Sequence, residues 1–179
     1  MKIAVFCGSS IGNNTYFKEQ AYKLGKEFAK LGITLIYGGA SSGIMGELAS
    51  STLANNGQVI GVMPKALQKK EITNKNLSEL HIVETMHERK KLMMDFADGF
   101  IVFPGGIGTM EEFFEVFTWN TIGIINKPCI LLNIDGYYDL LIQFFYKMEK
   151  EGFLKSAVRE KLLIKESLDD AITAIINNI

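Results

Sequence analysis

The sequence lacks the features that mark several large classes of protein. Its 179 residues contain only two cysteines, and 19 basic residues nearly balance 20 acidic ones. A chain without an excess of positive charge is a poor partner for a polyanion, so we expect no nucleic-acid binding. No apolar stretch approaches the roughly 18 residues that cross a membrane, and the apolar run at the N-terminus is too short for a signal segment. These absences predict a cytoplasmic protein.

Disulfide and metal-binding patterns are missing as well. Cys7 and Cys129 lie in separate apolar runs, as is typical of reduced cysteines in a protein core. His81 and His87 do not have the spacing of a zinc signature. The sequence therefore predicts no metal site and no cofactor.

Short apolar runs alternate with amphipathic stretches along the whole chain. Strands are expected at 3–7, 34–37, 58–63, 80–84, 99–103 and 129–133. Helices are expected at 15–31, 44–55, 86–96, 111–122, 137–150, 155–162 and 168–176, and a polar loop at 65–76. The alternation predicts one α/β domain over residues 1–179, with a doubly wound, mainly parallel sheet covered by helices on both faces.

Three glycine-rich loops, at 8–12, 38–46 and 104–108, each follow a predicted strand. Because parallel strands end at the same edge of a sheet, the three loops should gather there, where such folds bind ligands. Glycines let the backbone approach a ligand closely; the alternative is that the loops are only tight strand-to-helix turns. From the first two loops, the candidate ligand contacts are Gly8, Ser9, Gly38, Gly39 and Gly43.

The third loop belongs to the most informative segment, Pro-Gly-Gly-Ile-Gly-Thr-Met-Glu-Glu at 104–112. It runs from a buried-strand pattern into a helical one, and a helix N-terminus offers free N–H groups to a phosphate. A site that only held phosphate would gain nothing from the two carboxylates of Glu111 and Glu112. Phosphate donors and acids together predict chemistry on the group attached to the phosphate.

The two acids admit different structural roles. Thr109 and Glu112 have the spacing of a capping box, with Thr109 as the N-cap, so Glu112 could serve the helix alone. Glu111, Glu115 and Thr118 share one helix face, which could point toward the edge of the sheet.

Two nucleotide fingerprints begin in these loops and are not completed. Residues 38–43 have P-loop spacing, but Ile44 and Met45 replace the lysine and hydroxyl residue that would reach phosphate and magnesium. Residues 106–108 begin a dinucleotide fingerprint, but Glu111 stands where its third glycine belongs. No acidic residue ends the second strand to bind a ribose. ATP hydrolysis and NAD binding are therefore not expected.

A basic pair stands at an unusual place in the sequence. Arg89 and Lys90 fall in the first turns of a predicted helix, where the helix dipole disfavours cations. Local rules tend to fail at functional sites, and an arginine fork can hold a phosphate or a base edge by two hydrogen bonds. The alternative is a solvated charged face.

Four motifs occur in order at 5–10, 37–46, 86–90 and 104–112: Val-Phe-Cys-Gly-Ser-Ser, Tyr-Gly-Gly-Ala-x-x-Gly-x-Met-Gly, Met-His-Glu-Arg-Lys and the segment above. Together they resemble the LONELY GUY family of cytokinin riboside 5′-monophosphate phosphoribohydrolases. The resemblance implies a Rossmann-like fold, a homodimer, and a small-molecule nucleotide substrate. It implies hydrolysis of the N-glycosidic bond of N6-modified adenosine 5′-monophosphates, or of AMP, to free base and ribose 5-phosphate.

The family pattern also implies roles for single residues. Arg89 and Glu112 match positions assigned to catalysis. The residues implied to contact the nucleotide are Glu71, Lys90, Gly105, Gly106, Ile107, Gly108, Thr109, Met110, Glu111 and Thr118. Similar proteins have been labelled lysine decarboxylases, but nothing in the sequence marks a Schiff-base lysine or a pyridoxal phosphate pocket. A non-catalytic carrier resembling molybdenum-cofactor carriers is the alternative, and the preferred base stays open.

Overall fold

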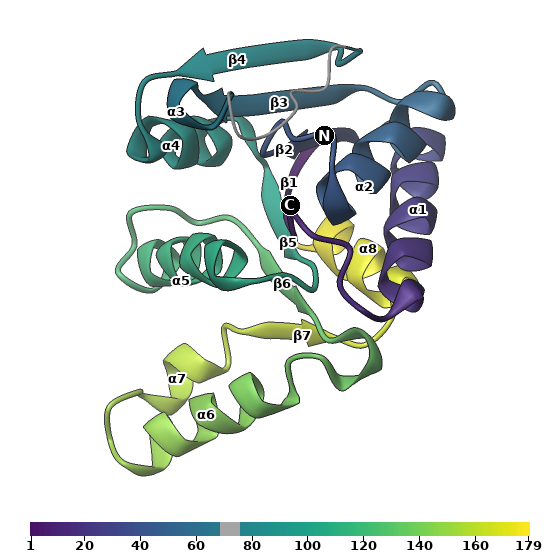
Figure 1. Ribbon diagram of the computed structural model, residues 1–179. Coiled ribbons are helices and arrows are strands. Elements are labelled where there is room, and N and C mark those ends of the chain that lie inside the picture. Colours follow the sequence, from purple (N-terminus) through teal and green to yellow (C-terminus); the bar gives the residue numbers. More distant parts are fainter. Residues whose placement is uncertain (69–75) are drawn as a thin grey trace.

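Seven strands form one parallel sheet in the order β4-β3-β2-β1-β5-β6-β7, in a computed structural model that describes residues 1–68 and 76–179 (Figure 1). The strands are β1 Lys2–Phe6, β2 Thr34–Tyr37, β3 Val59–Pro64, β4 Glu79–Val83, β5 Gly99–Val102, β6 Cys129–Leu132 and β7 Leu163–Lys165. The predicted doubly wound parallel sheet is confirmed. Glu71 lies outside the described residues.

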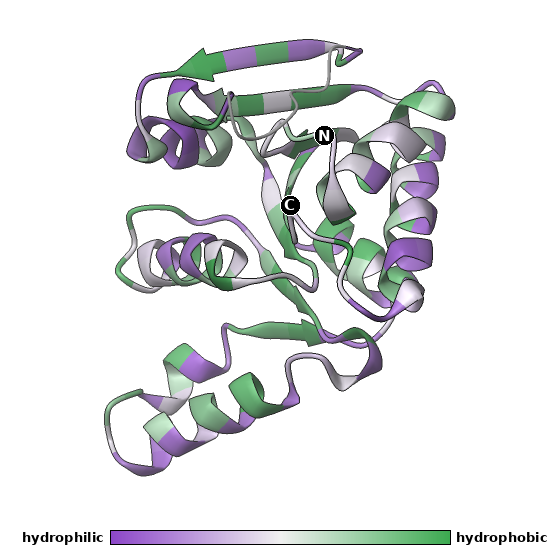
Figure 2. Ribbon diagram, viewed as in Figure 1, coloured by the Kyte–Doolittle hydropathy of each residue, from purple (hydrophilic) through white to green (hydrophobic). Residues whose placement is uncertain are grey.

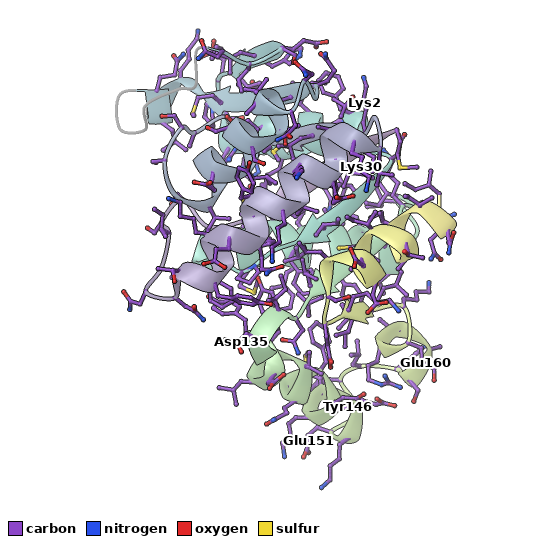
Figure 3. All side chains as sticks on the ribbon, turned by 90° about the vertical axis from the view of Figure 1, so that its right-hand side faces the viewer. Lys2, Lys30, Asp135, Tyr146, Glu151 and Glu160 are labelled. Carbon is purple, nitrogen blue, oxygen red and sulfur yellow. The ribbon has the colours of Figure 1, made fainter. Side chains whose placement is uncertain are left out.

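Helices cover both faces of this sheet. They are α1 Thr15–Lys30, α2 Gly43–Ala54, α3 Lys65–Gln68, α4 Met86–Phe96, α5 Ile107–Thr121, the 3₁₀ turn η1 Ile134–Gly136, α6 Asp139–Lys150, α7 Ser156–Arg159 and α8 Leu168–Asn177. Helices α1, α2 and α8 pack on one face, where Figure 3 shows α1 and α8 lying across the sheet. Helices α4, α5 and α6 pack on the other face. None of the helices described is long and apolar enough to cross a membrane.

The central strands are buried on both sides, which explains their nearly continuous apolar runs. Along β1, Ile3 and Val5 belong to the core under α1 and α2, whereas Ala4 and Phe6 belong to the core under α4 and α5. Figure 2 shows mostly hydrophobic colouring on the inner strands, such as β3 and β6, and hydrophilic bands on the helices and on the edge strand β4. Cys7 and Cys129 are free and buried in these two cores.

The structure differs from the prediction in four places. Strand β7 is absent from the prediction, because three half-buried residues at a sheet edge give too little periodicity to detect. The helix predicted over 155–162 is only the single turn α7, and the loop predicted from residue 65 begins with the helical turn α3. Helix α5 begins at Ile107 and not at 111.

The order of strands reverses between β1 and β5, which are neighbours in space and far apart in sequence. The chain winds outward from β1 through β2 on one side and from β5 through β6 on the other. Folds of this kind bind ligands at such a switch point, outside the carboxyl ends of the strands.

Candidate active site

The three glycine-rich loops meet at the switch point, as predicted. The backbone N–H of Gly8 donates to the carbonyl of Pro104 over 3.3 Å, and the N–H of Met45 donates to the carbonyl of Gly8 over 3.2 Å. Gly43 has a φ of +67°, and a β-carbon there would lie 2.2 Å from the carbonyl carbon of Ser9. Only glycine fits at position 43, so this glycine allows the first two loops to pack together.

Helix α5 starts directly from the third loop, with Gly106 as its N-cap. Thr109 lies inside the first turn and is only 3% exposed, so the alternative in which Thr109 and Glu112 form a capping box is wrong. The extended backbone of Gly106 begins the helix three residues earlier than the box would. Glu112 therefore has no role as a cap.

The amides at the start of α5 are not covered by a capping side chain. By contrast, the side chains of Asn14, Thr85 and Ser167 accept hydrogen bonds from the first turns of α1, α4 and α8. A β-carbon on Gly105 would lie 2.2 Å from Oγ1 of Thr109, so the loop packs tightly against the helix it leads into. Among the residues that the structure describes, no capping side chain accepts from the N–H donors at the N-terminus of α5, which leaves them to a ligand.

A cavity of about 280 Å³ lies at this helix start. It is lined by Cys7, Gly8, Ser9, Met45, Leu67, Met86, Arg89, Gly106, Ile107, Gly108, Thr109, Glu111 and Glu112. The structure therefore brings together the predicted catalytic pair, the start of α5 and part of the first loop.

A second cavity, of about 410 Å³, lies on the other side of the third loop. It shares Gly8, Ser9 and Gly106 with the first and continues along the first loop to Phe17 and Tyr137. The Tyr137 hydroxyl donates to the carbonyl of Gly105 over 2.7 Å and so anchors the loop between the two cavities.

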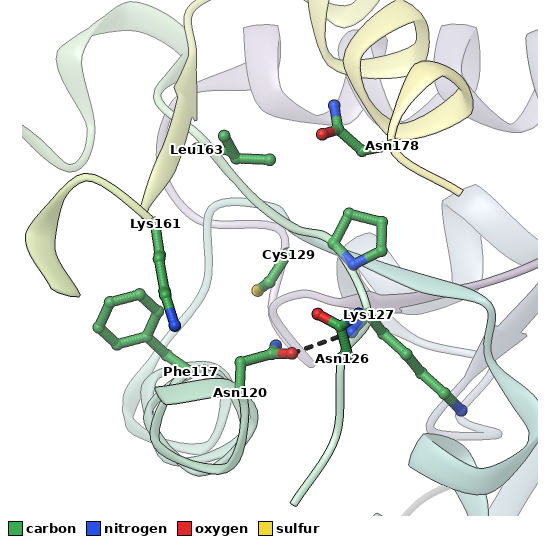
Figure 4. A pocket seen from close by; sticks show the side chains of 9 residues that line it. Phe117, Asn120, Asn126, Lys127, Cys129, Lys161, Leu163 and Asn178 are labelled. Carbon is green, nitrogen blue, oxygen red and sulfur yellow. Dashed lines mark hydrogen bonds between the residues drawn. The ribbon is translucent and has the colours of Figure 1, made fainter. Parts of the chain in front are cut away.

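Several predicted residues line neither cavity: Gly38, Gly39, Gly43, Lys90, Met110 and Thr118. Gly105 lines the second cavity but not the first. A separate cavity at the amino ends of β6 and β7 is lined by Asn120, Lys127 and Lys161 among others, and by none of the predicted site residues that the structure describes (Figure 4).

Arg89 is held rigidly beside the first cavity. It is 6% exposed, its Nε donates to the carbonyl of Val62 over 3.2 Å, and its Nη1 lies 3.7 Å from Oε1 of Glu112. A β-carbon at Gly38 would lie 1.9 Å from Nη2 of Arg89. Gly38 thus makes room for the guanidinium group, a role that its place in a glycine-rich loop did not reveal.

Glu112 is a buried carboxyl, 8% exposed. Burial raises the pKa of Glu112 to about 7; Glu111 and Glu115 add to this shift, whereas Arg89 and Lys90 oppose it. A carboxyl with a pKa near neutrality can both take up and release a proton at a working pH, as general acid–base catalysis requires.

Lys90 bridges α4 and α5 on the same side of the sheet. It is 6% exposed, and its Nζ forms ion pairs with Glu111 and, at 2.8 Å, with Oε2 of Glu115. Glu115 is a residue for which the sequence predicted no role in the site. Its i, i+4 spacing from Glu111 was the available signal, because that spacing puts both carboxylates on one helix face.

Comparison with known proteins gives several strong similarities. Residues 45–175 match a family described as "Possible lysine decarboxylase". The chain is 42% identical to a cytokinin riboside 5′-monophosphate phosphoribohydrolase of Rhodococcoides fascians, over 97% of this chain and 88% of that protein. It is 42% identical to the Arabidopsis thaliana cytokinin riboside 5′-monophosphate phosphoribohydrolase LOG1, over 96% of this chain and 80% of that one.

Solved structures with lower identity share the fold. The molybdenum cofactor binding protein of Rippkaea orientalis superposes with a TM-score of 0.75 at 22% identity, covering 98% of this chain and 95% of that one. The Moco carrier protein of Chlamydomonas reinhardtii superposes with a TM-score of 0.70 at 19% identity, with the same coverage. At these identities the likeness concerns the fold alone.

Proposed function

The chain belongs to the family of cytokinin riboside 5′-monophosphate phosphoribohydrolases, and we propose that it hydrolyses the N-glycosidic bond of adenosine 5′-monophosphates. The substrates are N6-modified nucleotides, whose free bases are active cytokinins, and AMP itself. The products are the free base and ribose 5-phosphate. One observation carries the proposal: the buried Glu112 carboxyl faces the Arg89 guanidinium in a cavity that begins at the uncapped N-terminus of α5.

The start of α5 is the place for the 5′-phosphate. The backbone N–H groups from Gly105 to Thr109 supply hydrogen bonds and the positive end of the helix dipole. A phosphate bound there puts the ribose over the second turn of the helix, where Glu111 and Glu112 stand. Glu111 is exposed on the cavity wall and would bind the ribose hydroxyls.

Glu112 then acts at C1′ of the ribose. Breaking the bond to the base builds positive charge on the sugar, as in glycosidases. The Glu112 carboxylate stabilises this charge and accepts a proton from the attacking water. Water thereby supplies the hydroxyl group on C1′, and the proton that Glu112 takes up passes to the departing base, which returns Glu112 to its carboxylate form. A guanidinium group offers hydrogen-bond donors and no acceptor, so Arg89 serves by hydrogen-bonding the leaving base or orienting Glu112.

The family description as a possible lysine decarboxylase does not fit the lysine at this site. A Schiff base needs an unprotonated amine. Burial alone would lower the pKa of Lys90, but its ion pairs with Glu111 and Glu115 outweigh burial and raise it. Lys90 therefore stays an ammonium group, unsuited to covalent catalysis.

The whole chain, in this proposal, works as one nucleotide-binding domain of a cytoplasmic homodimer that binds no nucleic acid. Apolar side chains are exposed along α6 and beyond it, with Leu140 79% exposed, Phe144 about half exposed and Phe153 87% exposed. Figure 2 shows hydrophobic bands alternating with hydrophilic ones along α6. A surface of this kind supports association with a second copy.

A carrier that binds a nucleotide or cofactor without cleaving it is the rival function, favoured by the fold shared with molybdenum-cofactor carriers. A carrier of an anionic ligand gains no affinity from two carboxylates beside its anion site, because they repel the ligand. Incubation with AMP and with isopentenyladenosine 5′-monophosphate, followed by chromatography, separates the two functions. The proposal predicts free adenine and isopentenyladenine; a nucleotide recovered bound and intact would favour the carrier.

A further inference from the structure

The burial of Lys90 near the N-terminus of α4 is energetically unfavourable for a charged lysine. Lys90 is 6% exposed and lies in the second turn of α4, close to the helix end where the dipole disfavours cations. Its neighbour Lys91 is exposed and forms an ordinary surface pair with Asp95, at 2.8 Å. A buried ammonium group needs close anionic partners to remain charged.

These partners come from α5. The Nζ of Lys90 pairs with Oε1 of Glu111 and with Oε2 of Glu115, and the latter oxygen is fully buried. Glu111 lines the cavity that holds Glu112, whereas Lys90 and Glu115 do not line it. Lys90 therefore influences the cavity through its ion pair with Glu111 and not by lining it.

The charges around Glu112 nearly cancel. Among the described residues, the groups that act on it are Arg89 and Lys90 from α4, Glu111 and Glu115 from α5, and Cys7, which directly follows β1. Burial raises the pKa of the Cys7 thiol, which stays neutral. Within residues 1–68 and 76–179, the cluster has two cations and three carboxylates, Glu112 included, so it is neutral when one carboxylate holds a proton. Glu112 is the most buried of the three carboxylates.

From these contacts we propose that Lys90 and Glu115 are positioning residues of the active site. Lys90 fixes the Glu111 carboxylate on the cavity wall, and the opposite charges of Lys90 and Glu115 decide at which pH Glu112 loses its proton. The inference rests on the proposed hydrolysis, in which Glu112 acts as the base. It differs from the role implied by the family resemblance, in which Lys90 contacts the nucleotide directly.

The pH dependence of kcat/KM tests this pair, because the two residues act in opposite directions. Lys90→Met removes a cation and should move the acidic limb of the profile to higher pH. Glu115→Gln removes an anion and should move the same limb to lower pH. Each shift should be on the order of one pH unit for a single charge in a partly buried cluster. A purely structural role for the pair would not produce shifts of opposite sign.

Three controls sharpen the comparison. Lys91→Met removes the exposed neighbouring lysine and should leave the profile in place, and Lys90→Arg keeps the charge and should hold the limb near its wild-type position. Lys90→Met should lower kcat by roughly tenfold or more, because Glu111 is no longer fixed. An increase in KM alone, with kcat and the profile unchanged, would overturn the proposal and make Lys90 a nucleotide contact.

Carbon-13 NMR titration of the glutamate carboxyl groups tests the same pair without turnover. Glu112 should titrate at higher pH in Lys90→Met and at lower pH in Glu115→Gln than in the wild-type protein. If the wild-type protein released no base, the proposed function would fail while this titration still decided the role of the pair. If Lys90→Met did not fold, Glu115→Gln would carry the test. Unchanged titration of Glu112 in the folded variants would overturn the proposal.

Discussion

Gly38 and Arg89 are packed so closely that a β-carbon at position 38 would lie 1.9 Å from Nη2 of the arginine. The two residues are 51 positions apart in sequence and meet because the loop after β2 lies beside the start of α4. The guanidinium group is held on its other side by the carbonyl of Val62. The position of Arg89 relative to Glu112 thus depends on the absence of a side chain at Gly38.

Gly38→Ala should therefore impair catalysis by displacing Arg89. A shift of about an ångström in a catalytic group can cost roughly a hundredfold in rate, so we expect a loss of that order in kcat while the circular dichroism spectrum is retained. The measurement is base release from AMP, with Arg89→Ala and the double variant as partners in a cycle. If Gly38 acts through Arg89, the alanine at 38 should add little to the loss in Arg89→Ala; fully additive losses would contradict this.

Activity should rise with pH through about 7, because Glu112 must be ionised to act as the base and burial raises its pKa to about 7. The kcat/KM profile of the wild-type enzyme should show an acidic limb with this midpoint. A limb at pH 4 to 5, near the ordinary glutamate pKa of 4.5, would contradict the burial of Glu112 in solution.

The same group should make the fold less stable as pH rises from about 4.5 to about 7. In this window the folded protein keeps the Glu112 proton and the unfolded chain has lost it, so the free energy of unfolding falls with increasing pH. Thermal unfolding of Glu112→Gln should lack this contribution. The difference in Tm between the variant and the wild-type protein should therefore grow in favour of the variant across the window, and a constant difference would count against the prediction.

The 5′-phosphate should control specificity. A nucleoside leaves the donors at the start of α5 without their anion, and a site built to bind a polar group discriminates strongly against a substrate that lacks it. We expect kcat/KM for AMP to exceed that for adenosine by at least about a hundredfold. Comparable values for the two substrates would refute the assignment of the α5 N-terminus as the phosphate site.

The exposed apolar surface of α6 should mediate self-association. Replacing Leu140, which is 79% exposed, with aspartate should convert a dimer to a monomer in size-exclusion chromatography with light scattering. Lys147→Met, on the same helix and in an exposed pair with Glu151, is the matched control and should leave the mass unchanged. A wild-type protein that elutes as a monomer would contradict the proposed homodimer.

The sequence predicted the sheet well because buried parallel strands and amphipathic helices leave strong periodic signals. The predicted start of α5 was wrong because local patterns compete there. Thr109 and Glu112 have capping-box spacing, yet Gly106 begins the helix earlier. The contact of Gly38 with Arg89 and the bridge from Lys90 to Glu115 could not be predicted in this way. Both join segments that only the packing of α4 against its neighbours brings together.

The rate of base release by Glu112→Gln tests the central claim most directly. Glutamine keeps the size of the side chain but cannot accept the water proton or supply negative charge at C1′. We expect the release of adenine from AMP to fall by about 10²–10³ relative to the wild-type enzyme, with the fold intact because Glu112 does not cap α5. A folded Glu112→Gln variant that releases adenine at the wild-type rate would contradict the account.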